Sequence, residues 1–435
     1  GLSANKGTFM LIFLSSNMNR GAKMNSADTG FMLICSAMVL FMTPGLSLFY
    51  GGFVRRKNVL NTIMMSTLMI GLAIVMWVAF GYSLSFGGNH FGIIGDFRNA
   101  FFNGIGSKPG SYSDSIPAYV YAAFQMMFAI ITPALISGAV AERMKFKAYF
   151  IFMALWSIIV YYPMAHMVWG QGGFLASIGA VDFAGGNVVH ISSGFSALVL
   201  CILLGKRKGY DTQSYRTHNI PMIAIGAFVL LFGWFGFNAG SALKADGLAA
   251  HAFITTAVSA GAAMLSWIII EWKHNGTPSL VGAVTGIVAG LVAITPGAGF
   301  VPVWAALIIG ALVSPLCYFF ISVVKKHFGY DDALDAFGCH GIGGVWGGIA
   351  TGLFAQKSIN PIAQWDGLVF GETRLILAQV ISILVTIVVA IVGTLICAGV
   401  TRVFTPLKTN KREEDIGLDS SEHGESGYPS FNGLD

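Results

Sequence analysis

Charged residues are scarce in this chain of 435 residues: Asp, Glu, Lys and Arg make up 10% of it, against roughly 25% in soluble domains. Hydrophobic residues make up 55%, and apolar segments of about 20 residues, each long enough to cross a bilayer as a helix, recur along nearly the whole length. The composition therefore predicts an all-α polytopic membrane protein. The net charge of +5 does not indicate nucleic acid as a partner, and none is expected.

The sequence also lacks paired cysteines and a nucleotide-binding motif. Its cysteines lie singly in or beside apolar segments, without metal-site or disulfide spacing, at Cys35, Cys201, Cys317, Cys339 and Cys397. We expect them to be small, buried apolar residues. No G-x-x-x-x-G-K-[ST] motif is present, which argues against ATP-driven transport.

Apolar runs broken by charge, Gly and Pro predict eleven transmembrane helices. The expected spans are 30–50, 59–86, 117–140, 149–169, 185–205, 219–241, 249–271, 279–296, 303–324, 336–355 and 373–404. Most Lys and Arg residues fall in alternate connections and after the last span, so the positive-inside rule predicts an N-terminus outside and a C-terminus in the cytoplasm. We therefore expect a multi-pass protein of the cell inner (plasma) membrane.

Three regions are expected along the chain. Residues 1–24 form an N-terminal extension, either a leader remnant or an added segment, because their apolar run GTFMLIFLSS is too short to cross a bilayer. Residues 25–407 form the membrane domain. Residues 408–435 are polar and charged, and we expect them to be a solvated cytoplasmic tail.

An internal repeat relates the two halves of the membrane domain. DFAGGNVVHISSG opens the fifth span and DALDAFGCHGIGG opens the tenth; in both, His follows Asp by eight residues and Gly follows His by four. These residues are Asp182, His190 and Gly194, and Asp332, His340 and Gly344. Because five spans separate the copies, the pattern predicts two inverted five-helix repeats, at about 30–205 and 219–355, plus an eleventh helix at about 373–404.

The two aspartates and two histidines are the first candidate site residues. We expect Asp182 and Asp332 to cap their helices; an influence of Asp182 on a cation outside is the alternative for that residue. His190 and His340 lie eight residues deeper, about 12 Å at 1.5 Å per residue. In a hydrocarbon core about 30 Å thick, the two rings, entering from opposite faces, are expected to approach each other.

Three interpretations of the histidine pair remain open. It is an interhelical hydrogen bond, a pore or proton relay, as intramembrane ionisable groups often are, or the metal site of a membrane metalloenzyme. Zinc needs at least three protein ligands, and no third His, Cys or carboxylate stands at comparable depth. We therefore expect no metal and no cofactor, and favour a small neutral molecule or a proton as the species that meets the rings.

Glycine ridges predict close helix packing. Two G-x3-G-x3-G patterns occur, at Gly282, Gly286 and Gly290 and at Gly344, Gly348 and Gly352. Small residues at this spacing let helix backbones approach closely, which would leave only a narrow path between them.

Aromatic residues gather towards the predicted outer ends of three spans. Trp169 ends the fourth span, Phe237 and Ser241 end the sixth, and Phe128 lies in the third. Each alone is typical of an interface belt or a core. Together their π faces and hydroxyl would attract a small monovalent cation.

Six long segments match one known family. They are PGLSLFYGGFVRRKN, AHMVWG, DFAGGNVVH, GWFGFNAGS, PSLVGAVTGIVAGLVAITP and DAFGCHGIGG. Together they resemble the ammonium transporter family (Amt/Mep, related to Rh proteins), from about residue 25 to the tail. The resemblance implies a transporter and not an enzyme, which recruits NH4+ outside, deprotonates it and conducts NH3, with or without a separately relayed proton.

The resemblance also implies roles for individual residues. Phe128, Trp169 and Ser241 match the outer ammonium-recruitment site. Phe124 accompanies that site, and Phe128 and Phe237 take the place of its stacked phenylalanine gate. These aromatic residues favour a bacterial-type Amt over an Rh protein.

Three further residues match the pore of such proteins. His190 and His340 match the twin histidines that line the hydrophobic pore. Asp182 matches a buried aspartate that is required for both structure and function.

Partners follow from the resemblance as well. Such proteins are homotrimers with one pore per subunit, and they transport ammonium and its analogue methylammonium. The tail resembles the conserved bacterial tail, through which subunits couple and a P-II type signal-transduction protein acts; its matching residues are Glu414, Gly417, Asp419, His423, Gly424, Glu425 and Tyr428. An ammonium sensor built on the same fold is the alternative function.

Overall fold

The protein is described by a computed structural model that covers residues 24–210, 212 and 217–428. Apart from residue 24, the expected N-terminal extension lies outside the described residues, as do residues 429–435 of the expected tail. The described chain is helical apart from one short hairpin. An apolar chain favours helices because a helix satisfies its own backbone hydrogen bonds where water is absent.

The helices follow one another along the chain, and the connections from α4 to α5 and from α15 to α16 are long. The α-helices are α2 (Ser26–Phe53), α3 (Val59–Met76), α4 (Tyr82–Phe86), α5 (Ala118–Val140), α6 (Phe146–Trp156), α7 (Tyr162–Trp169), α8 (Phe174–Ser177), α9 (Ser192–Leu204), α10 (Ile220–Gly240), α11 (Gly247–Asn275), α12 (Leu280–Ile294), α13 (Val303–Phe319), α14 (Lys325–Phe328), α15 (Ile342–Phe354), α16 (Arg374–Phe404), α17 (Lys411–Ile416) and α18 (Leu418–His423). The π-helical segments are η2 (Trp77–Gly81), η4 (Ser157–Tyr161), η5 (Gly186–Ile191), η6 (Phe320–Val324) and η7 (Phe337–Gly341). The 3-10 turns are η1 (Arg56–Asn58), η3 (Ala100–Phe102) and η8 (Leu368–Phe370), and the antiparallel hairpin pairs β1 (Pro109–Gly110) with β2 (Ser113–Pro117).

Nine helical segments of the described residues are long and apolar enough to cross a membrane. They are Ser26–Phe53, Arg56–Phe86, Ala118–Val140, Phe146–Ser177, Gly186–Leu204, Ile220–Gly240, Gly247–Asn275, Val303–Phe328 and Arg374–Phe404. Helix α12 is apolar but only 15 residues long, and η7 and α15 together run from Phe337 to Phe354. The all-helical, multi-pass character is confirmed, and the count of eleven spans stays a prediction.

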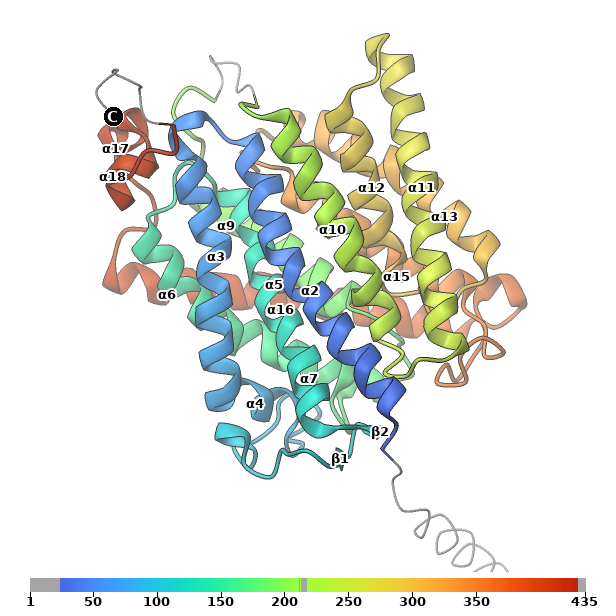
Figure 1. The fold of residues 1–435 in the computed structure, drawn as a ribbon. Coiled ribbons are helices and arrows are strands. Elements are labelled where there is room, and N and C mark those ends of the chain that lie inside the picture. Colours follow the sequence, from blue (N-terminus) through green and yellow to red (C-terminus); the bar gives the residue numbers. More distant parts are fainter. Residues whose placement is uncertain (1–23, 211, 213–216, 429–435) are drawn as a thin grey trace, which may run out of the picture.

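The helices form one bundle with two different ends (Figure 1). Helices α17 and α18 lie at one end, named here the tail end, and the β1–β2 hairpin lies at the other, named the hairpin end. Helix α10 packs along α2, α12 lies against α11 and α13, and α16 crosses α6, α9 and α15. The two copies of the repeated motif meet inside the bundle, because η5 and α9 contact η7 and α15.

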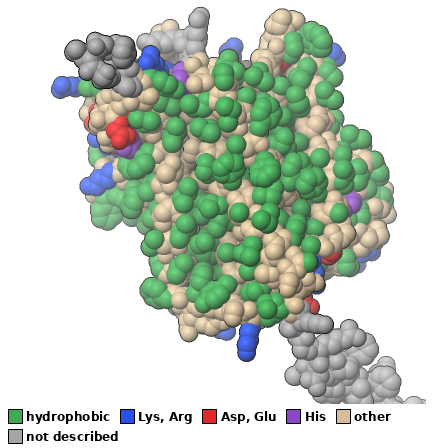
Figure 2. All heavy atoms as spheres, in the orientation of Figure 1, with side chains coloured by type: hydrophobic (Ala, Val, Ile, Leu, Met, Phe, Trp, Pro, Cys, Tyr) green, Lys and Arg blue, Asp and Glu red, His purple; other side chains and the backbone are tan. Residues whose placement is uncertain are grey.

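Hydrophobic side chains cover the long sides of the bundle. Figure 2 shows them over the middle of one face, with charged side chains near its ends and beside the tail. On α16, Leu384 and Val388 are 57% and 59% exposed. Exposing apolar surface to water costs roughly 25 cal/mol per Å², so a surface of this kind suits lipid.

The predictions for cysteine and for the glycine ridges are confirmed. All five cysteines are free and buried. A Cβ added at Gly286 or Gly290 would come within 2.8 or 2.6 Å of a Cβ on α11. One added at Gly348 or Gly352 would come within 2.9 or 2.6 Å of an isoleucine on α16. Glycine therefore sets the spacing of these helix pairs.

A buried group of charges joins the connections at the tail end. We name Glu142, Arg143, Arg207 and Asp331 the ion cluster; they come from three connections, those after α5, α9 and α14, and each side chain is at most 6% exposed. Arg207 donates to Asp331 through Nη2 at 2.8 Å and to Glu142 through Nη1 at 2.9 Å. Arg55 donates to Glu142 Oε1 through its backbone N and its Nε, at 2.7 and 3.0 Å.

The carboxylates of the ion cluster are held in their charged form. Burial raises the pKa of Glu142, but the charges of Arg207 and Arg55 outweigh it and the pKa lies below its ordinary value. Burial likewise raises the pKa of Asp331, and hydrogen bonds from Arg207 with the charge of Arg143 lower it further than burial raises it. Paired, buried charges of this kind are costly to break on one side only.

We therefore expect Glu142→Gln to destabilise the bundle. Removing the carboxylate charge leaves the Arg207 guanidinium buried with one partner fewer, which lowers the free energy of unfolding by about 3 kcal/mol. A lower midpoint of thermal unfolding in detergent would show this. Asp415→Asn is the control, because the Lys208–Asp415 pair is exposed, and it should leave the midpoint unchanged; equal shifts in both variants would contradict the role of the cluster.

The ion cluster also predicts a pH dependence of stability. In the folded protein the pKa values of Glu142 and Asp331 lie below their ordinary values of about 4. Their contribution to the free energy of unfolding is therefore fully present above about pH 4, and it is lost as the pH falls through the pKa values of the folded protein. Titration of this cluster should therefore not change the midpoint temperature of unfolding between about pH 5 and 8. At pH values below about 4 the midpoint temperature should decrease. The acid-induced fall should be smaller in Glu142→Gln.

Candidate functional site

Two buried aspartates open the helices that carry the histidines. The Asp182 carboxylate accepts hydrogen bonds from four successive backbone N–H groups, those of residues 185–188, at 2.7–3.4 Å. The Asp332 carboxylate accepts from the N–H groups of residues 336 and 337, at 3.1 and 2.8 Å. Each aspartate thus satisfies N–H groups at the positive end of a helix, as the sequence predicts.

The histidines lie in π-helical segments that touch each other. His190 lies in η5 and His340 in η7, and such segments are frequent at functional sites. A Cβ added at Gly194 would lie 2.2 Å from the backbone N of Gly341, and one added at Gly344 would lie 3.1 Å from the Cβ of His190. The glycine of each repeated motif is therefore what lets the two histidine-bearing segments come into contact.

The two imidazole rings meet, as their spacing in the sequence predicts. His190 Nδ1 and His340 Nδ1 are 3.3 Å apart, with ring centroids 5.4 Å apart and planes inclined by 15°. The side chains are buried, and His190 Nε2 has no hydrogen-bond partner among the described residues. Because one Nδ1 must donate and the other accept, the pair suits two neutral rings with a nitrogen left for a small polar molecule.

The predicted recruitment residues line one cavity of about 350 Å³ near the hairpin end. We name it the aromatic cavity; Phe124, Phe128, Trp169, Asp182 and Ser241 are among its lining residues. Phe128 meets Trp169 edge to face at 5.8 Å and Phe124 at 5.0 Å. Trp169 Nε1 donates to the backbone oxygen of Asp182 at 2.9 Å, so the helix cap also orients the indole ring.

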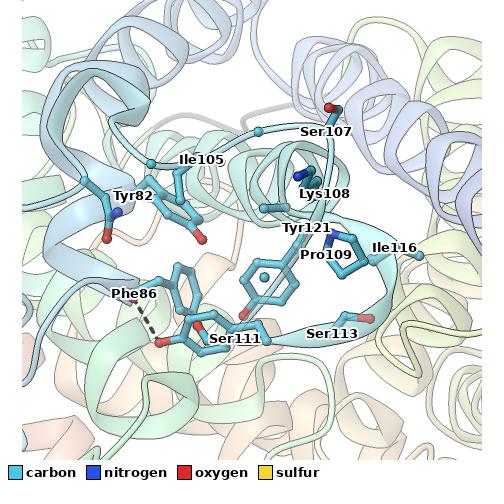
Figure 3. Close-up of a pocket in the computed structure, with 16 residues that line it drawn as sticks. Tyr82, Phe86, Ile105, Ser107, Lys108, Pro109, Ser111, Ser113, Ile116 and Tyr121 are labelled. Atoms are coloured by element: carbon cyan, nitrogen blue, oxygen red, sulfur yellow. Dashed lines mark hydrogen bonds between the residues drawn. The ribbon is translucent and has the colours of Figure 1, made fainter. Parts of the chain in front are cut away.

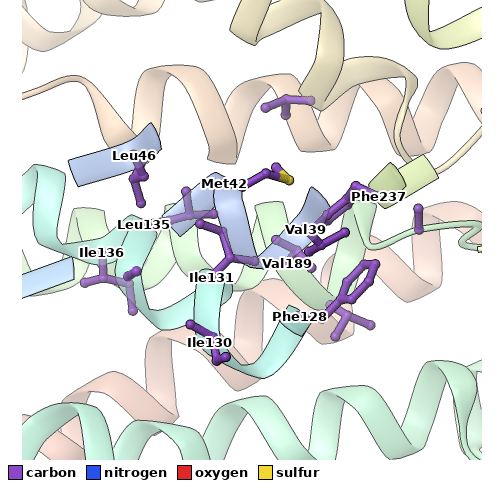
Figure 4. Close-up of a cluster of buried hydrophobic side chains, with 14 of the residues drawn as sticks. Val39, Met42, Leu46, Phe128, Ile130, Ile131, Leu135, Ile136, Val189 and Phe237 are labelled. Atoms are coloured by element: carbon purple, nitrogen blue, oxygen red, sulfur yellow. The ribbon is translucent and has the colours of Figure 1, made fainter. Parts of the chain in front are cut away.

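Two stacked phenylalanines close the inner end of the aromatic cavity. Phe128 and Phe237 lie 4.2 Å apart with planes inclined by 28°. Figure 4 shows the pair among buried apolar side chains that include Val39, Met42 and Val189. Both rings are 1% exposed, so the rings block the way between the aromatic cavity and the histidines.

Beyond the phenylalanine pair lies a very small cavity that contains the histidines. This histidine cavity has a volume of about 10 Å³, and apart from His190 and His340 its lining is apolar. A single water-sized molecule needs roughly 10–15 Å³ by the same measure. The cavity therefore suits a small molecule without its hydration shell.

A third cavity continues from the histidines towards the tail end. It has a volume of about 140 Å³, is named here the Glu271 cavity, and shares Phe49, Val288 and His340 with the histidine cavity. Its two carboxylates are engaged: Glu271 accepts from Ser279 N at 2.7 Å, and Asp335 from Lys325 Nζ at 2.6 Å. The three cavities thus follow one another across the bundle.

A side cavity of about 480 Å³ adjoins the aromatic cavity. The two cavities share Tyr112 and Tyr121 as lining residues, whose rings stack at 4.9 Å. Figure 3 shows Tyr121 inside the side cavity, with Phe86 and Pro109 also facing it. The stacked tyrosines therefore form a wall between the two spaces.

Two residues near the path were not singled out in the sequence. Trp234 stacks on His190 at 5.4 Å, and its Nε1 donates to Thr295 Oγ1 at 2.9 Å. Gln125 lines the aromatic cavity. Trp234 stands three residues before Phe237 and Gln125 three before Phe128, so helical periodicity was the signal that would have found both.

The tail packs on the bundle through part of α17 and α18: Glu414, Leu418 and Asp419 are buried, whereas Lys411 and Arg412 stay exposed, as expected of a solvated tail. Glu414 Oε2 accepts from the backbone N of Lys208 at 2.9 Å, and Lys57 Nζ donates to the backbone oxygen of Glu414 at 2.7 Å. Gly417 has φ of 106°, and a Cβ there would lie 2.6 Å from the Lys57 Cβ. Leu418 is fully buried.

The next tail residues continue this contact. Asp419 Oδ1 accepts from the backbone N of Asn61 at 2.8 Å. The chain then turns at Gly424, with φ of 67°, and the Glu425 N–H donates to the backbone oxygen of Asp419 at 3.1 Å. Helix α18 therefore ends in a closed turn, which lies beside the start of α3.

Two aromatic tail residues complete the docking surface. The His423 ring meets Phe146 edge to face at 4.8 Å. The Tyr428 hydroxyl lies 3.2 Å from His218 Nε2, and the Tyr428 backbone oxygen accepts from Arg56 Nη2 at 3.0 Å. Five of the seven predicted tail residues thus contact the bundle at the tail end, whereas Gly424 and Glu425 form the turn within the tail.

Among the described residues, no group of three or more His, Cys, Asp or Glu side chains is arranged to hold a metal ion. The histidine pair is accompanied instead by apolar side chains.

Comparison with known proteins agrees with this arrangement. The model of the Ammonium Transporter Family matches residues 30–428. An ammonium transporter of Bacillus subtilis (strain 168) is 51% identical over 406 residues, which are 93% of this chain and 99% of that protein. Among solved structures, Mep2 of Saccharomyces cerevisiae has 32% identity and a TM-score of 0.86, with 94% of this chain and 93% of that chain covered. A structure named Sensor Amt Protein has 28% identity and a TM-score of 0.83, with 91% and 98% covered. The chain belongs to the ammonium transporter family.

Proposed function

We propose that this protein transports ammonium across the cell inner membrane by recruiting NH4+ in the aromatic cavity and passing NH3 along the histidine pair. The observation that carries the proposal is the order of the parts. An open cavity with π faces, a stacked phenylalanine pair, two adjoining imidazoles and a second cavity follow one another across the bundle.

The proposal includes the predicted topology. Residues 25–407 would form the membrane domain of eleven spans, with the N-terminus outside, so the aromatic cavity opens outside and the tail end faces the cytoplasm. Two features support the inverted repeat at about 30–205 and 219–355. The histidines occupy π-helical segments η5 and η7 in the fifth and tenth predicted spans, and η4 and η6 are π-helical in the fourth and ninth.

Recruitment would use charge–π attraction and hydrogen bonding together. A cation in the aromatic cavity meets the rings of Phe128 and Trp169, and each favourable ring contact contributes about 0.5–2 kcal/mol. Ser241 Oγ donates its proton to the backbone oxygen of Phe237 at 2.9 Å, so its lone pairs face the cation as acceptors. Phe124 packs behind Phe128 and holds its ring.

Deprotonation would occur before the phenylalanine pair. Carrying a bare cation through hydrocarbon costs several kcal/mol, whereas neutral ammonia matches the apolar lining and small volume of the histidine cavity. The proton that NH4+ loses there would pass to water outside. His190 and His340 would then bind ammonia, and a proton that crosses separately would pass between their facing nitrogens. The Asp182 carboxylate supports the site by orienting helix η5 and, through its backbone, the Trp169 ring.

The docked tail is proposed as the regulatory element. Residues 408–435 would couple the pores of a homotrimer and carry the contact with a P-II type signal-transduction protein in the cytoplasm. The support is that the predicted tail residues touch the connections beside α3, α6 and α10, so a change in the tail bears directly on the helices.

An ammonium sensor is the second candidate function. It is favoured by the likeness to the structure named Sensor Amt Protein, whereas the relative with 51% identity is named a transporter. In a sensor, occupancy of the aromatic cavity would be transmitted through the tail without transport.

We expect Trp169→Leu to raise the half-saturating ammonium concentration about 2- to 30-fold, because one π face is lost from the cation site. Ammonium-dependent current and uptake in proteoliposomes measure this. Trp169→Phe, which keeps a ring, should lie between wild type and Trp169→Leu. Trp272→Leu is the control, since Trp272 is 61% exposed on the surface; a shift of the same size there would contradict recruitment by Trp169.

Replacing both histidines by leucine should abolish the ammonium-coupled current. Without imidazole nitrogens the narrow cavity offers no acceptor for a proton, so the charge cannot follow the ammonia. Current after an ammonium jump, recorded at several pH values, provides the measurement. An undiminished, ammonium-selective current in the double variant would refute the relay.

Two controls separate transport from sensing. His327→Leu, which changes an exposed histidine, should leave the current unchanged. If wild-type protein gave neither current nor ammonium uptake, the transporter proposal would fail and the sensor would take its place.

A further inference from the structure

Gln125 also lines the aromatic cavity, but recruitment of ammonium by the aromatic rings and Ser241 gives this residue no role. It lies on α5, three residues before Phe128, and lines the cavity beside it. Its side chain is polar, yet only 8% of the residue is exposed. A buried amide in an aromatic surrounding is costly unless its hydrogen bonds are made.

One end of the Gln125 amide has a partner among the described residues, and the other end has none. Nε2 donates to the Tyr121 hydroxyl at 3.5 Å, whereas Oε1 is buried without a hydrogen-bond partner among the described residues. A carbonyl oxygen only accepts hydrogen bonds. Whatever completes this site must therefore donate an N–H or an O–H.

The surroundings of Gln125 indicate the charge of that donor. The aromatic cavity presents the rings of Phe124, Phe128 and Trp169, and no Lys or Arg stands among the described residues that line it. The Asp182 carboxylate, also in the lining, is occupied by backbone N–H groups. A cation with N–H groups in several directions can make cation–π contacts with the rings and at the same time donate a hydrogen bond to Gln125 Oε1.

A second amide of the same cavity has an unpaired atom of the opposite kind. Asn360 lines the same cavity, its Oδ1 accepts from the Ile362 N–H at 3.1 Å, and its buried Nδ2 has no partner among the described residues. Nδ2 can only donate, so it needs an acceptor such as water, which a cation cannot be. The two amides therefore differ in the partner that they require.

We propose that Gln125 is a specificity-determining residue of ammonium recruitment, whose Oε1 accepts one N–H of the cation while Ser241 Oγ accepts another. This inference rests on the proposed function and deepens it. Two acceptors and the π faces together replace part of the hydration shell that ammonium loses on entry. Tyr121 is a positioning residue, because its hydroxyl holds the amide nitrogen away from the cation.

Three variants test the role of Gln125. Gln125→Leu removes the acceptor and should raise the half-saturating ammonium concentration about tenfold, the lower end of the range for a hydrogen bond to a charged group. Gln125→Glu keeps two acceptor oxygens and should hold the half-saturating concentration at or below that of wild type. Tyr121→Phe frees the amide to rotate and should give a smaller rise than Gln125→Leu.

The measurement is ammonium-dependent current and uptake in proteoliposomes, with the half-saturating concentration and the maximal rate determined separately. The maximal rate of Gln125→Leu should stay within about twofold of wild type, because an interaction made only on binding affects half-saturation first. Gln171→Leu is the matched control: Gln171 is exposed and is not among the lining residues of the aromatic cavity. It should leave both quantities unchanged.

Each outcome bears on a different claim. If wild type transports but Gln125→Leu and Gln171→Leu have equal half-saturating concentrations, only water meets the amide and the inference is wrong. A lower maximal rate with unchanged half-saturation would make Gln125 structural and would overturn it as well. If Gln125→Leu fails to fold, impaired half-saturation in Gln125→Glu would overturn the inference. A wild-type protein without current or uptake would instead refute the proposed function on which the inference rests.

Discussion

The close crossing of η5 and α9 with η7 and α15 is the contact on which the rest of the site depends. At Gly194 and Gly344 the two backbones leave no room for a side chain. This contact brings the Nδ1 atoms of His190 and His340 to 3.3 Å, and it leaves beside them a cavity of only about 10 Å³. A wider crossing would separate the rings and admit hydrated species, so the narrowness of the path and the pairing of the histidines have one cause.

The cost of burying polar groups explains most of the other features. Asp182 and Asp332 satisfy N–H groups that the helix starts leave without partners. The ion cluster pairs Asp331 with Arg143 and Arg207, and Glu142 with Arg207. At His190 Nε2 and Gln125 Oε1 a polar atom beside a cavity has no partner among the described residues, so a molecule that enters the cavity can supply one.

The docked tail and a histidine-bearing helix are linked through the tail-end connections. Asp419 contacts the start of α3, and Glu414 contacts the connection that follows α9. The connection that precedes α3 meets Glu142, and the one that follows α9 meets Asp331 of the ion cluster. Asp331 precedes Asp332, which opens the helix of His340. Hydrogen bonds and peptide bonds together therefore connect the docked tail with the start of that helix.

Sequence alone determined the helical membrane fold, the repeated Asp-His-Gly pattern and the approach of the two histidines, because hydrophobic length and residue spacing act locally along the chain. The local structure differs from the prediction in two places: the predicted span 279–296 is a helix of 15 residues, Leu280–Ile294, and the histidines lie in π-helical rather than regular turns. Only the tertiary structure decided that the tail is docked, that Trp234 stacks on His190, and that Gln125 Oε1 has no partner among the described residues. Those features depend on contacts between residues far apart in the chain, such as Asn61 with Asp419, and outside the repeated motif no pattern of hydrophobicity or spacing indicates which distant side chains will meet.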